Sequence, residues 1–168
     1  MNKNENLNNN KHKDKETILV ERLAARGWHI AFAESCTGGL AAARLINVPS
    51  ASSVIDESIV TYSNEAKIKY LHVSPESIRQ HGVVSEKVAG EMAEGIARAA
   101  ESEAGVGISG IAGPTGAVPG KPVGTVCFGF YIHGTVKTAV KYFGDIGRNE
   151  VRRASVEFVF DTLLAMIG

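Results

Sequence analysis

The sequence has little of several features that would assign it to a class of protein. Only two of its 168 residues are cysteines, too few for a disulfide framework or a four-ligand zinc site. No apolar run approaches the ~20 residues that span a bilayer, and the polar N-terminus does not resemble a secretory signal. Lys and Arg together number 18, as do Asp and Glu, so the chain lacks the net positive charge of non-specific nucleic-acid binders. These absences favour a soluble, cytoplasmic protein with no direct contact to nucleic acid or membrane.

The length favours one domain that buries a core of its own. Residues 1–16 contain almost no apolar side chains and begin with six asparagines among the first ten positions, which predicts a disordered tail. A basic arm for nucleic acid is the alternative, but acidic residues nearly cancel the lysines of this segment. We therefore expect the folded domain to span residues 17–168.

Hydrophobic spacing predicts helices that alternate with strands, followed by a hairpin. Helices are expected over 17–27, 37–46, 63–70, from 74 onward, from 85 onward and over 148–167. Strands are expected over 28–33, 54–62, 105–109, 123–132 and 135–143, the last two joined at His133-Gly134. This order indicates a single α/β domain: a mixed, mostly parallel sheet with a C-terminal hairpin and helices on both faces, an α/β/α sandwich.

Two glycine-rich stretches spell nucleotide-binding motifs without the required context. Gly105–Gly110 matches a dinucleotide fingerprint, but its glycines overlap a predicted strand and no helix follows. Gly116–Lys121 resembles a phosphate loop, but Pro122 stands where Ser or Thr would hold magnesium. The five histidines show no metal-ligand spacing, so we expect no metal site.

The stretch Ala33–Gly39 joins the first predicted strand to its helix, where open α/β sheets bind ligands. Free N–H groups at the helix start would favour a phosphate or a developing oxyanion, and Gly38 and Gly39 would let a ligand approach the backbone. Alternatively, Ser35 or Thr37 merely caps the helix and the glycines ease packing. The residues alone do not decide between the two interpretations.

Thr61–Lys67 lies at the corresponding end of the second predicted strand. Lys67 and Lys69 are roughly 200° apart around a helix, so only one of them can face a shared cleft. A lysine that acts as a base must lose its proton near neutral pH, which burial or a neighbouring cation favours. Serine activated by lysine is an established alternative to Ser-His-Asp, and no His-Asp pair suggests itself here.

Two further elements could contact a ligand. Ser109–Gly116 is a glycine-rich loop that could present N–H groups to a phosphate or carbonyl oxygen, or could be a flexible connection. Arg148 and Arg152 follow Gly144 and could clamp a phosphate. They could equally pair with surface carboxylates, the role we favour for Arg152.

Together these stretches resemble the CinA C-terminal domain family and, within it, the stand-alone nicotinamide-nucleotide amidases. The resemblance covers roughly residues 17–167 and is carried by Ala33–Gly39, Val60–Lys67, His81–Glu86, Ser109–Pro114 and Lys121–Val126, with Gly144–Arg152 matching more loosely because Gly147 is inserted before Arg148. It implies hydrolysis of nicotinamide mononucleotide to nicotinate mononucleotide and ammonia in pyridine nucleotide (NAD) salvage, without a metal or organic cofactor. Many members carry a larger N-terminal domain that is not found here, so activities of that domain are not carried over.

The resemblance also implies roles for individual residues. Ser35 matches the nucleophile, Lys67 the base and Tyr62 an assisting hydroxyl. In the mechanism that we expect for these residues, backbone N–H groups at the helix start hold the oxyanion. The expected substrate-binding residues are Cys36, Thr37, Gly38, Gly39, Ser109, Gly110, Ile111, Ala112, Gly113 and Arg148. We expect a homodimer, as is common for small α/β enzymes. A non-catalytic nucleotide- or partner-binding module linked to competence or recombination is the alternative function, and an amidase for another amide is a third.

Overall fold

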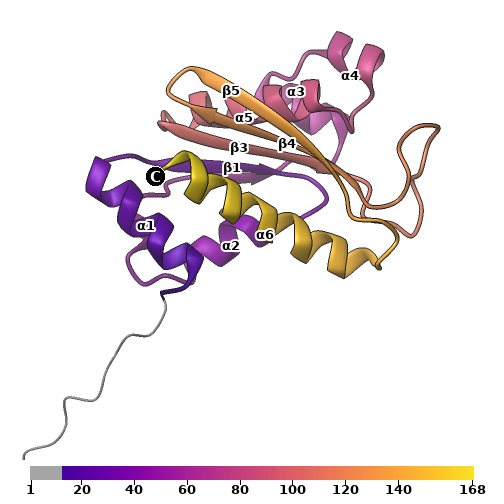
Figure 1. The fold of residues 1–168 in the computed structure, drawn as a ribbon. Helices are drawn as coiled ribbons and strands as arrows, with labels where there is room; N and C mark the ends of the chain where they lie inside the picture. Colours follow the sequence, from indigo (N-terminus) through magenta and orange to yellow (C-terminus); the bar gives the residue numbers. More distant parts are fainter. Residues whose placement is uncertain (1–12) are drawn as a thin grey trace, which may run out of the picture.

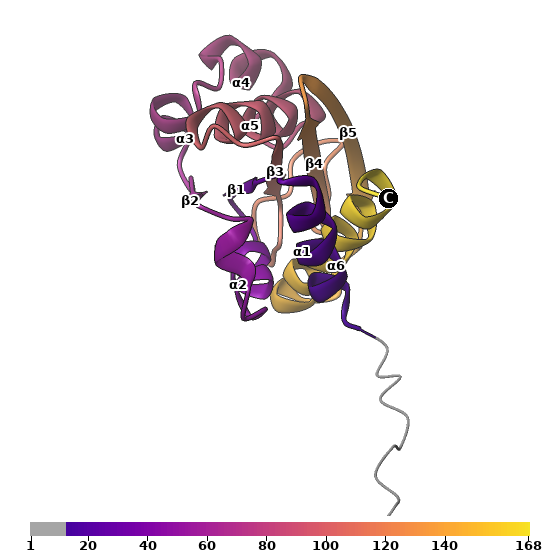
Figure 2. The same cartoon turned by 90° about the vertical axis from the view of Figure 1, so that its left-hand side faces the viewer.

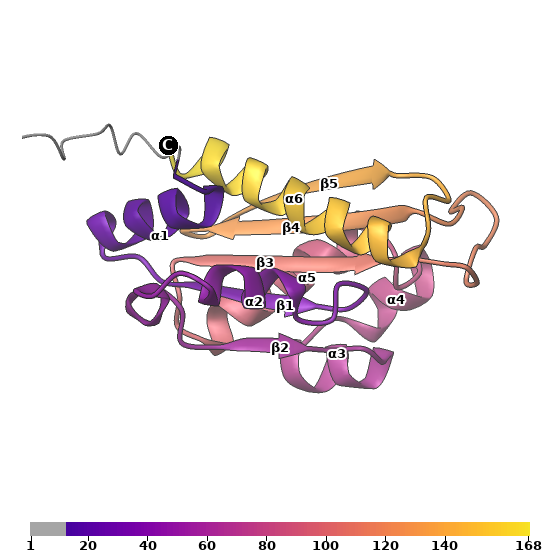
Figure 3. The ribbon, with the colours of Figure 1, turned by 90° about the horizontal axis from the view of Figure 1, so that it is seen from below.

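Five strands form one sheet in the computed structural model, which describes residues 13–168. They are β1 (Ile30–Glu34), β2 (Ser58–Val60), β3 (Ala104–Gly110), β4 (Thr125–Ile132) and β5 (Thr135–Tyr142). Their order across the sheet is β2-β1-β3-β4-β5 (Figure 3). β1 pairs in parallel with β2 and β3, whereas β4 is antiparallel to β3 and β5. The sheet is therefore mixed and ends in the predicted hairpin.

Helices cover both faces of this sheet, as the sequence predicts (Figures 1 and 2). One face carries α1 (Lys15–Arg26), α2 (Leu40–Ile46) and α6 (Arg148–Met166); the other carries α3 (Asn64–Leu71), α4 (Pro75–His81) and α5 (Glu86–Ala99). Alternate residues of β1 point to opposite faces, so Phe32 packs in the core beneath α1, α2 and α6, while Ala31 and Ala33 pack in the core beneath α5. The architecture is the expected α/β/α sandwich.

α5 lies very close to the sheet because glycines of β3 and β4 face it. A Cβ on Gly105 would lie 2.3 Å from the Ala93 carbonyl oxygen, and a Cβ on Gly107 or Gly129 would lie 2.2 Å from that of Ala89. Any side chain at these positions would push the helix off the sheet. Two of the three glycines that spell a dinucleotide fingerprint, Gly105 and Gly107, therefore serve helix–sheet packing, whereas a Cβ on Gly110 would meet the Val126 side chain.

Several helix ends follow from their local sequence. Ser63, Ser74 and Ser85 precede α3, α4 and α5, and each hydroxyl accepts a hydrogen bond from an N–H of the first turn. Pro75 occupies the first position of α4, where its missing N–H costs nothing. Gly27 ends α1 in the left-handed conformation. These boundaries confirm the predicted ones.

Several elements differ in extent from the prediction. β1 and β4 each begin two residues later than predicted. α1 begins at Lys15, two residues inside the expected tail, because Lys15 pairs with Glu157 and Asp161 of α6; residues 1–12 of that tail lie outside the described residues. α2 begins at 40 rather than 37, since turns occupy 35–39. β2 covers only 58–60 of the predicted 54–62, because only these three residues pair with β1; a 3-10 helix (Ala51–Ser53) and its turn precede the strand. Within residues 13–168, no helix has the length and apolarity to cross a membrane.

Candidate functional site

The parallel pairing of β1 and β2 brings Ser35 and Lys67 together, although they are 32 residues apart in the chain. Ser35 directly follows β1, and Lys67 lies in α3, which follows β2. The Lys67 Nζ lies 3.2 Å from the Ser35 Oγ and 2.7 Å from the Thr61 carbonyl oxygen. A neutral amine can donate to that carbonyl and accept the Ser35 hydroxyl proton through its lone pair. This is the geometry of a nucleophile and its base.

Lys67 is held almost entirely out of solvent, with only 1% of its surface exposed. Burial disfavours the ammonium form and lowers the pKa of Lys67 to about 8. Its neighbour Lys69 is exposed, with its Nζ over the Tyr70 ring. The helical spacing thus separates the two lysines as expected, and Lys67 is the one that faces the site.

A cavity of about 190 Å³ opens beside this pair. It is lined by Ser35, Cys36, Tyr62, Asn64, Lys67, Val83, Val84, Ser109, Gly110, Ala112 and Arg148. These residues come from the loop after β1, the start of α3, the segment before α5, the end of β3 and the start of α6. No carboxylate is among them, so the two basic side chains dominate the local charge.

The expected substrate-binding residues divide into two groups. Those that line the cavity are Cys36, Ser109, Gly110, Ala112 and Arg148. Those that do not are Thr37, Gly38, Gly39, Ile111 and Gly113. Three cavity residues, Asn64, Val83 and Val84, were not predicted. Asn64 lies within Thr61–Lys67 and the two valines lie within His81–Glu86, stretches that were singled out, but two valines before a helix carry no chemical signal of their own.

Arg148, which lines the cavity, connects the cavity residue Tyr62 to the loop after β3. Its guanidinium donates to the Tyr62 hydroxyl at 2.8 Å and to the Gly113 carbonyl at 2.9 Å. The Tyr62 hydroxyl is thus bonded to Arg148 rather than to Ser35 or Lys67. Gly147, the inserted residue, lies before the first residue of α6 and leaves Arg148 at the cavity.

The start of α2 does not offer its N–H groups to a ligand, contrary to our expectation for the oxyanion. The buried Glu34 carboxylate accepts hydrogen bonds from the N–H groups of Gly39, Ala41 and Ala42 at 2.9–3.2 Å. Neither Ser35 nor Thr37 caps the helix, since the last side chain of β1 already fills this position. The Cys36 N–H, by contrast, donates to no backbone carbonyl within residues 13–168 and, like the Thr37 N–H, lies near the Cys36 sulfur.

Arg152 pairs with no carboxylate among residues 13–168, which corrects the role we favoured for it. Its Nε donates to the Cys36 carbonyl at 3.0 Å and one terminal nitrogen donates to the Thr37 carbonyl at 2.9 Å. The reason is that α6 packs beside α2, which places this half-buried guanidinium against the loop that carries Ser35.

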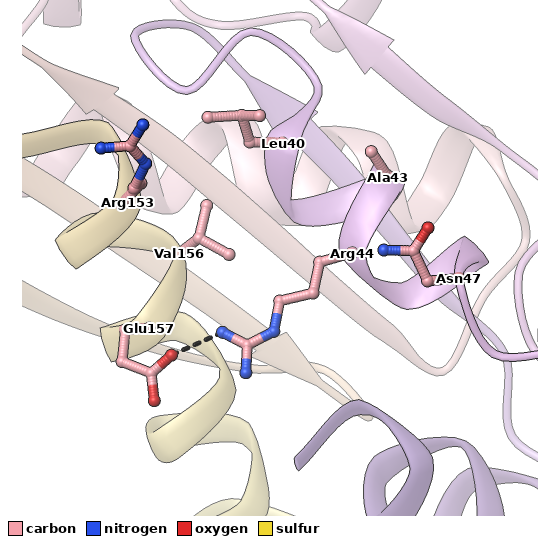
Figure 4. A pocket seen from close by; sticks show the side chains of 7 residues that line it. All are labelled: Leu40, Ala43, Arg44, Asn47, Arg153, Val156 and Glu157. Carbon is pink, nitrogen blue, oxygen red and sulfur yellow. Dashed lines mark hydrogen bonds and ion pairs between the residues drawn. The ribbon is translucent and has the colours of Figure 1, made fainter. Parts of the chain in front are cut away.

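A second hollow, of about 420 Å³, lies between α2 and α6, on the face of the sheet that these helices cover (Figure 4). Leu40, Ala43, Arg44, Asn47, Arg153, Val156 and Glu157 line it, and Arg44 pairs with Glu157 at 2.6 Å. It is larger but contains neither Ser35 nor Lys67. No cluster of three potential metal ligands occurs within residues 13–168.

Sequence comparison connects this chain to one family. The family profile of the CinA C-terminal domain matches residues 12–167. A CinA-like protein of Kosmotoga olearia is 49% identical over 149 residues, which cover 87% of this chain and 35% of that protein. A putative competence-damage inducible protein of Alkaliphilus metalliredigens is 45% identical over 88% of this chain and 36% of its own length. The chain thus spans about a third of the curated relatives it matches.

Solved structures agree with this connection. A competence-damaged protein (CinA) superfamily protein from Escherichia coli superposes with a TM-score of 0.87 at 36% identity, covering 90% of this chain and 88% of that one. One from Enterobacter cloacae gives a TM-score of 0.88 at 31% identity, covering 96% and 99%. The chain therefore belongs to the CinA family, as a CinA C-terminal domain.

Proposed function

We propose that this chain is an amidohydrolase that converts nicotinamide mononucleotide to nicotinate mononucleotide and ammonia, a step of pyridine nucleotide salvage. The observation that carries the reaction class is the buried Lys67 amine 3.2 Å from the Ser35 hydroxyl at the edge of a cavity. The substrate comes from the resemblance of the site sequences to nicotinamide-nucleotide amidases. The cavity chemistry is compatible with it.

The reaction begins with proton transfer from Ser35 to Lys67. The Ser35 Oγ bonds to the carboxamide carbon as neutral Lys67 takes the hydroxyl proton, and the Thr61 carbonyl holds the amine in place. The carbon–nitrogen bond then breaks, Lys67 returns the proton to the leaving nitrogen, and ammonia departs. Water attacks the resulting ester with Lys67 again as base, which releases the carboxylate and restores Ser35.

The Cys36 N–H is our candidate donor to the oxyanion, because it adjoins the nucleophile and its residue lines the cavity. A positioned donor of this kind contributes about 3 kcal/mol to the transition state. We assign this role to the Cys36 N–H and not to the N–H groups at the start of α2, because those already donate to the Glu34 carboxylate.

The charges at the cavity suit this substrate. Arg148 is a cation that can bind the phosphate. The pyridinium of the substrate makes its carbonyl more electrophilic and disfavours a second positive charge on Lys67. Arg148 donates to the Tyr62 oxygen, which leaves the Tyr62 hydroxyl proton free to donate to substrate.

Ammonia release from nicotinamide mononucleotide tests the proposal. Ser35→Ala and Lys67→Met are expected to lose activity by about 10³-fold or more while remaining folded. Lys69→Met is the matched control, since it removes a lysine from the same helix but outside the cavity, and it should keep wild-type activity. Comparable ammonia release by Ser35→Ala would refute the assignment.

Two parallel measurements separate the alternatives. Nicotinamide riboside, which lacks the phosphate, should react poorly; an equal rate would indicate an amidase that does not recognise phosphate. Nucleotide binding without ammonia release from any pyridine amide would instead indicate a non-catalytic binding module.

A further inference from the structure

Arg152 holds the peptide groups directly after the nucleophile. Two of its three side-chain hydrogen bonds go to consecutive carbonyls, those of Cys36 and Thr37, and the third goes to the Asn149 side-chain oxygen at 3.4 Å. Both residues are buried, whereas Arg152 is only half-buried and does not line the cavity. No carboxylate within residues 13–168 forms an ion pair with it. Its guanidinium is therefore directed at the loop backbone and not at substrate.

The loop backbone connects Arg152 to the nucleophile through two peptide groups. Arg152 donates to the Thr37 carbonyl, and the N–H of that same peptide group belongs to Gly38. The Gly38 N–H donates to the Ser35 carbonyl at 3.1 Å. The peptide group that contains the Ser35 carbonyl ends in the Cys36 N–H, the donor assigned above to the oxyanion.

Hydrogen bonds in such a chain polarise one another. A cation at the Thr37 carbonyl makes the Gly38 N–H a stronger donor, which in turn strengthens the Cys36 N–H. The same bonds fix the direction in which the Cys36 N–H points. Gly38 leaves room for this arrangement: it has a φ of +62°, and a Cβ there would lie 3.3 Å from a terminal nitrogen of Arg152.

We propose that Arg152 is a positioning residue that orients and polarises the Ser35–Cys36 peptide group for oxyanion stabilisation. It acts through the Thr37–Gly38 peptide group and has no contact with substrate. The proposal deepens the proposed function and rests on it for the identity of the nucleophile, but not for the substrate.

Reaction of Ser35 with phenylmethanesulfonyl fluoride tests the role without the natural substrate. The Ser35 Oγ bonds to the sulfonyl sulfur, fluoride leaves, and the hydroxyl proton passes to Lys67; the sulfonyl oxygens take up negative charge as a carboxamide oxygen does. We expect Arg152→Gln and Arg152→Lys to slow this labelling by about ten-fold or more, because neither side chain can hold both carbonyls with a guanidinium fork. Arg153→Gln removes the adjacent exposed arginine and should change the rate by less than about two-fold.

Deamidation kinetics supply the second readout. With nicotinamide mononucleotide, the Arg152 variants should lose kcat by a similar factor with KM nearly unchanged, because only the transition state carries the oxyanion. Wild-type labelling rates in a folded Arg152→Gln protein would overturn the proposal. A loss of labelling that merely follows the unfolded fraction, measured by circular dichroism in the same samples, would also overturn it.

The design keeps the two proposals distinguishable. If wild-type protein is labelled at Ser35 but releases no ammonia, the proposed substrate is wrong and the labelling rates still decide the role of Arg152. If ammonia is released normally and the Arg152 variants match wild type in both assays, only the positioning role is wrong.

Discussion

Lys67 combines a basic side chain with an environment that disfavours its charge. Its Nζ bonds to one hydroxyl and one carbonyl, and no carboxylate is bonded to it within residues 13–168. Burial without a counter-ion is the physical reason that its pKa falls to about 8. An amine of this kind is a usable base near neutral pH, at the cost of folding stability.

The activity should therefore depend on pH through this amine. Only neutral Lys67 accepts the Ser35 proton, so kcat/KM should rise about ten-fold per pH unit below the pKa of about 8 and level off above it. Initial rates of ammonia release between pH 6 and 9.5 measure the midpoint. A rate that still rises ten-fold per pH unit up to pH 9.5, as an ordinary lysine with a pKa of 10.5 would give, would contradict a desolvated base.

Replacement of Lys67 by an uncharged residue should reveal how much the buried ammonium lowers the free energy of unfolding. The pKa of Lys67 is about 8 when folded and 10.5 ordinarily, so the unfolded state binds more protons between these values and wild-type stability rises with pH across this window. The free energy of unfolding of Lys67→Met minus that of wild type should therefore be about 3 kcal/mol higher at pH 7 than at pH 10.5.

Urea unfolding of both proteins at the two pH values measures this difference. The exposed Lys69→Met control should change stability by no more than about 0.5 kcal/mol at either pH. A pH-independent offset for Lys67→Met would show that burial of the charge has no such cost.

At the scale of elements, the close packing of α5 on β3 depends on glycines, which have no side chain. The β3 glycines let the helix backbone approach the strand, and this approach places Val83 and Val84, just before α5, beside the end of β3 at the cavity. The same packing brings the Ser109 hydroxyl to the Val83 carbonyl, to which it donates at 2.8 Å. Helix–sheet distance and cavity shape are thus coupled.

Gly107→Ala should separate these two layers. The new Cβ would meet the Ala89 carbonyl oxygen at 2.2 Å, so we expect a loss of about 3 kcal/mol or more in the free energy of unfolding, measured by chemical denaturation. Gly134→Ala is the control: it also adds a methyl group, at a positive φ but with no atom within 4 Å, and should cost only about 1 kcal/mol. Equal losses would contradict the packing role.

At the scale of the whole molecule, the cavity forms where the segments that follow the carboxyl ends of several strands meet. Segments after β1, β2 and β3 surround it, and Arg148 at the start of the last helix, α6, completes its wall. A ligand that bridges these segments binds the folded state alone and stabilises it by mass action. The expected homodimer stays a prediction, which light scattering after size-exclusion chromatography would test.

Substrate should accordingly raise the melting temperature of the Ser35→Ala protein, which can bind but not react. We expect nicotinamide mononucleotide at about 100 times its Kd to add about 2.7 kcal/mol, a shift of several degrees for a domain of this size. Arg148→Gln in the same background should abolish most of the shift, whereas Arg153→Gln should preserve it. An undiminished shift in the Arg148→Gln protein would remove Arg148 from phosphate binding.

The sequence by itself determined the order of elements, the sandwich class and most helix caps, and it singled out Ser35 and Lys67 as the candidate pair, because periodicity, capping chemistry and family resemblance are written locally along the chain. Tertiary structure alone decided which groups are already occupied: Glu34 fills the start of α2, Arg152 binds the loop carbonyls, and Arg148 holds Tyr62. The physical reason is that hydrogen-bond partners and the burial that shifts the pKa of Lys67 depend on side chains brought together from distant segments, which no local pattern specifies.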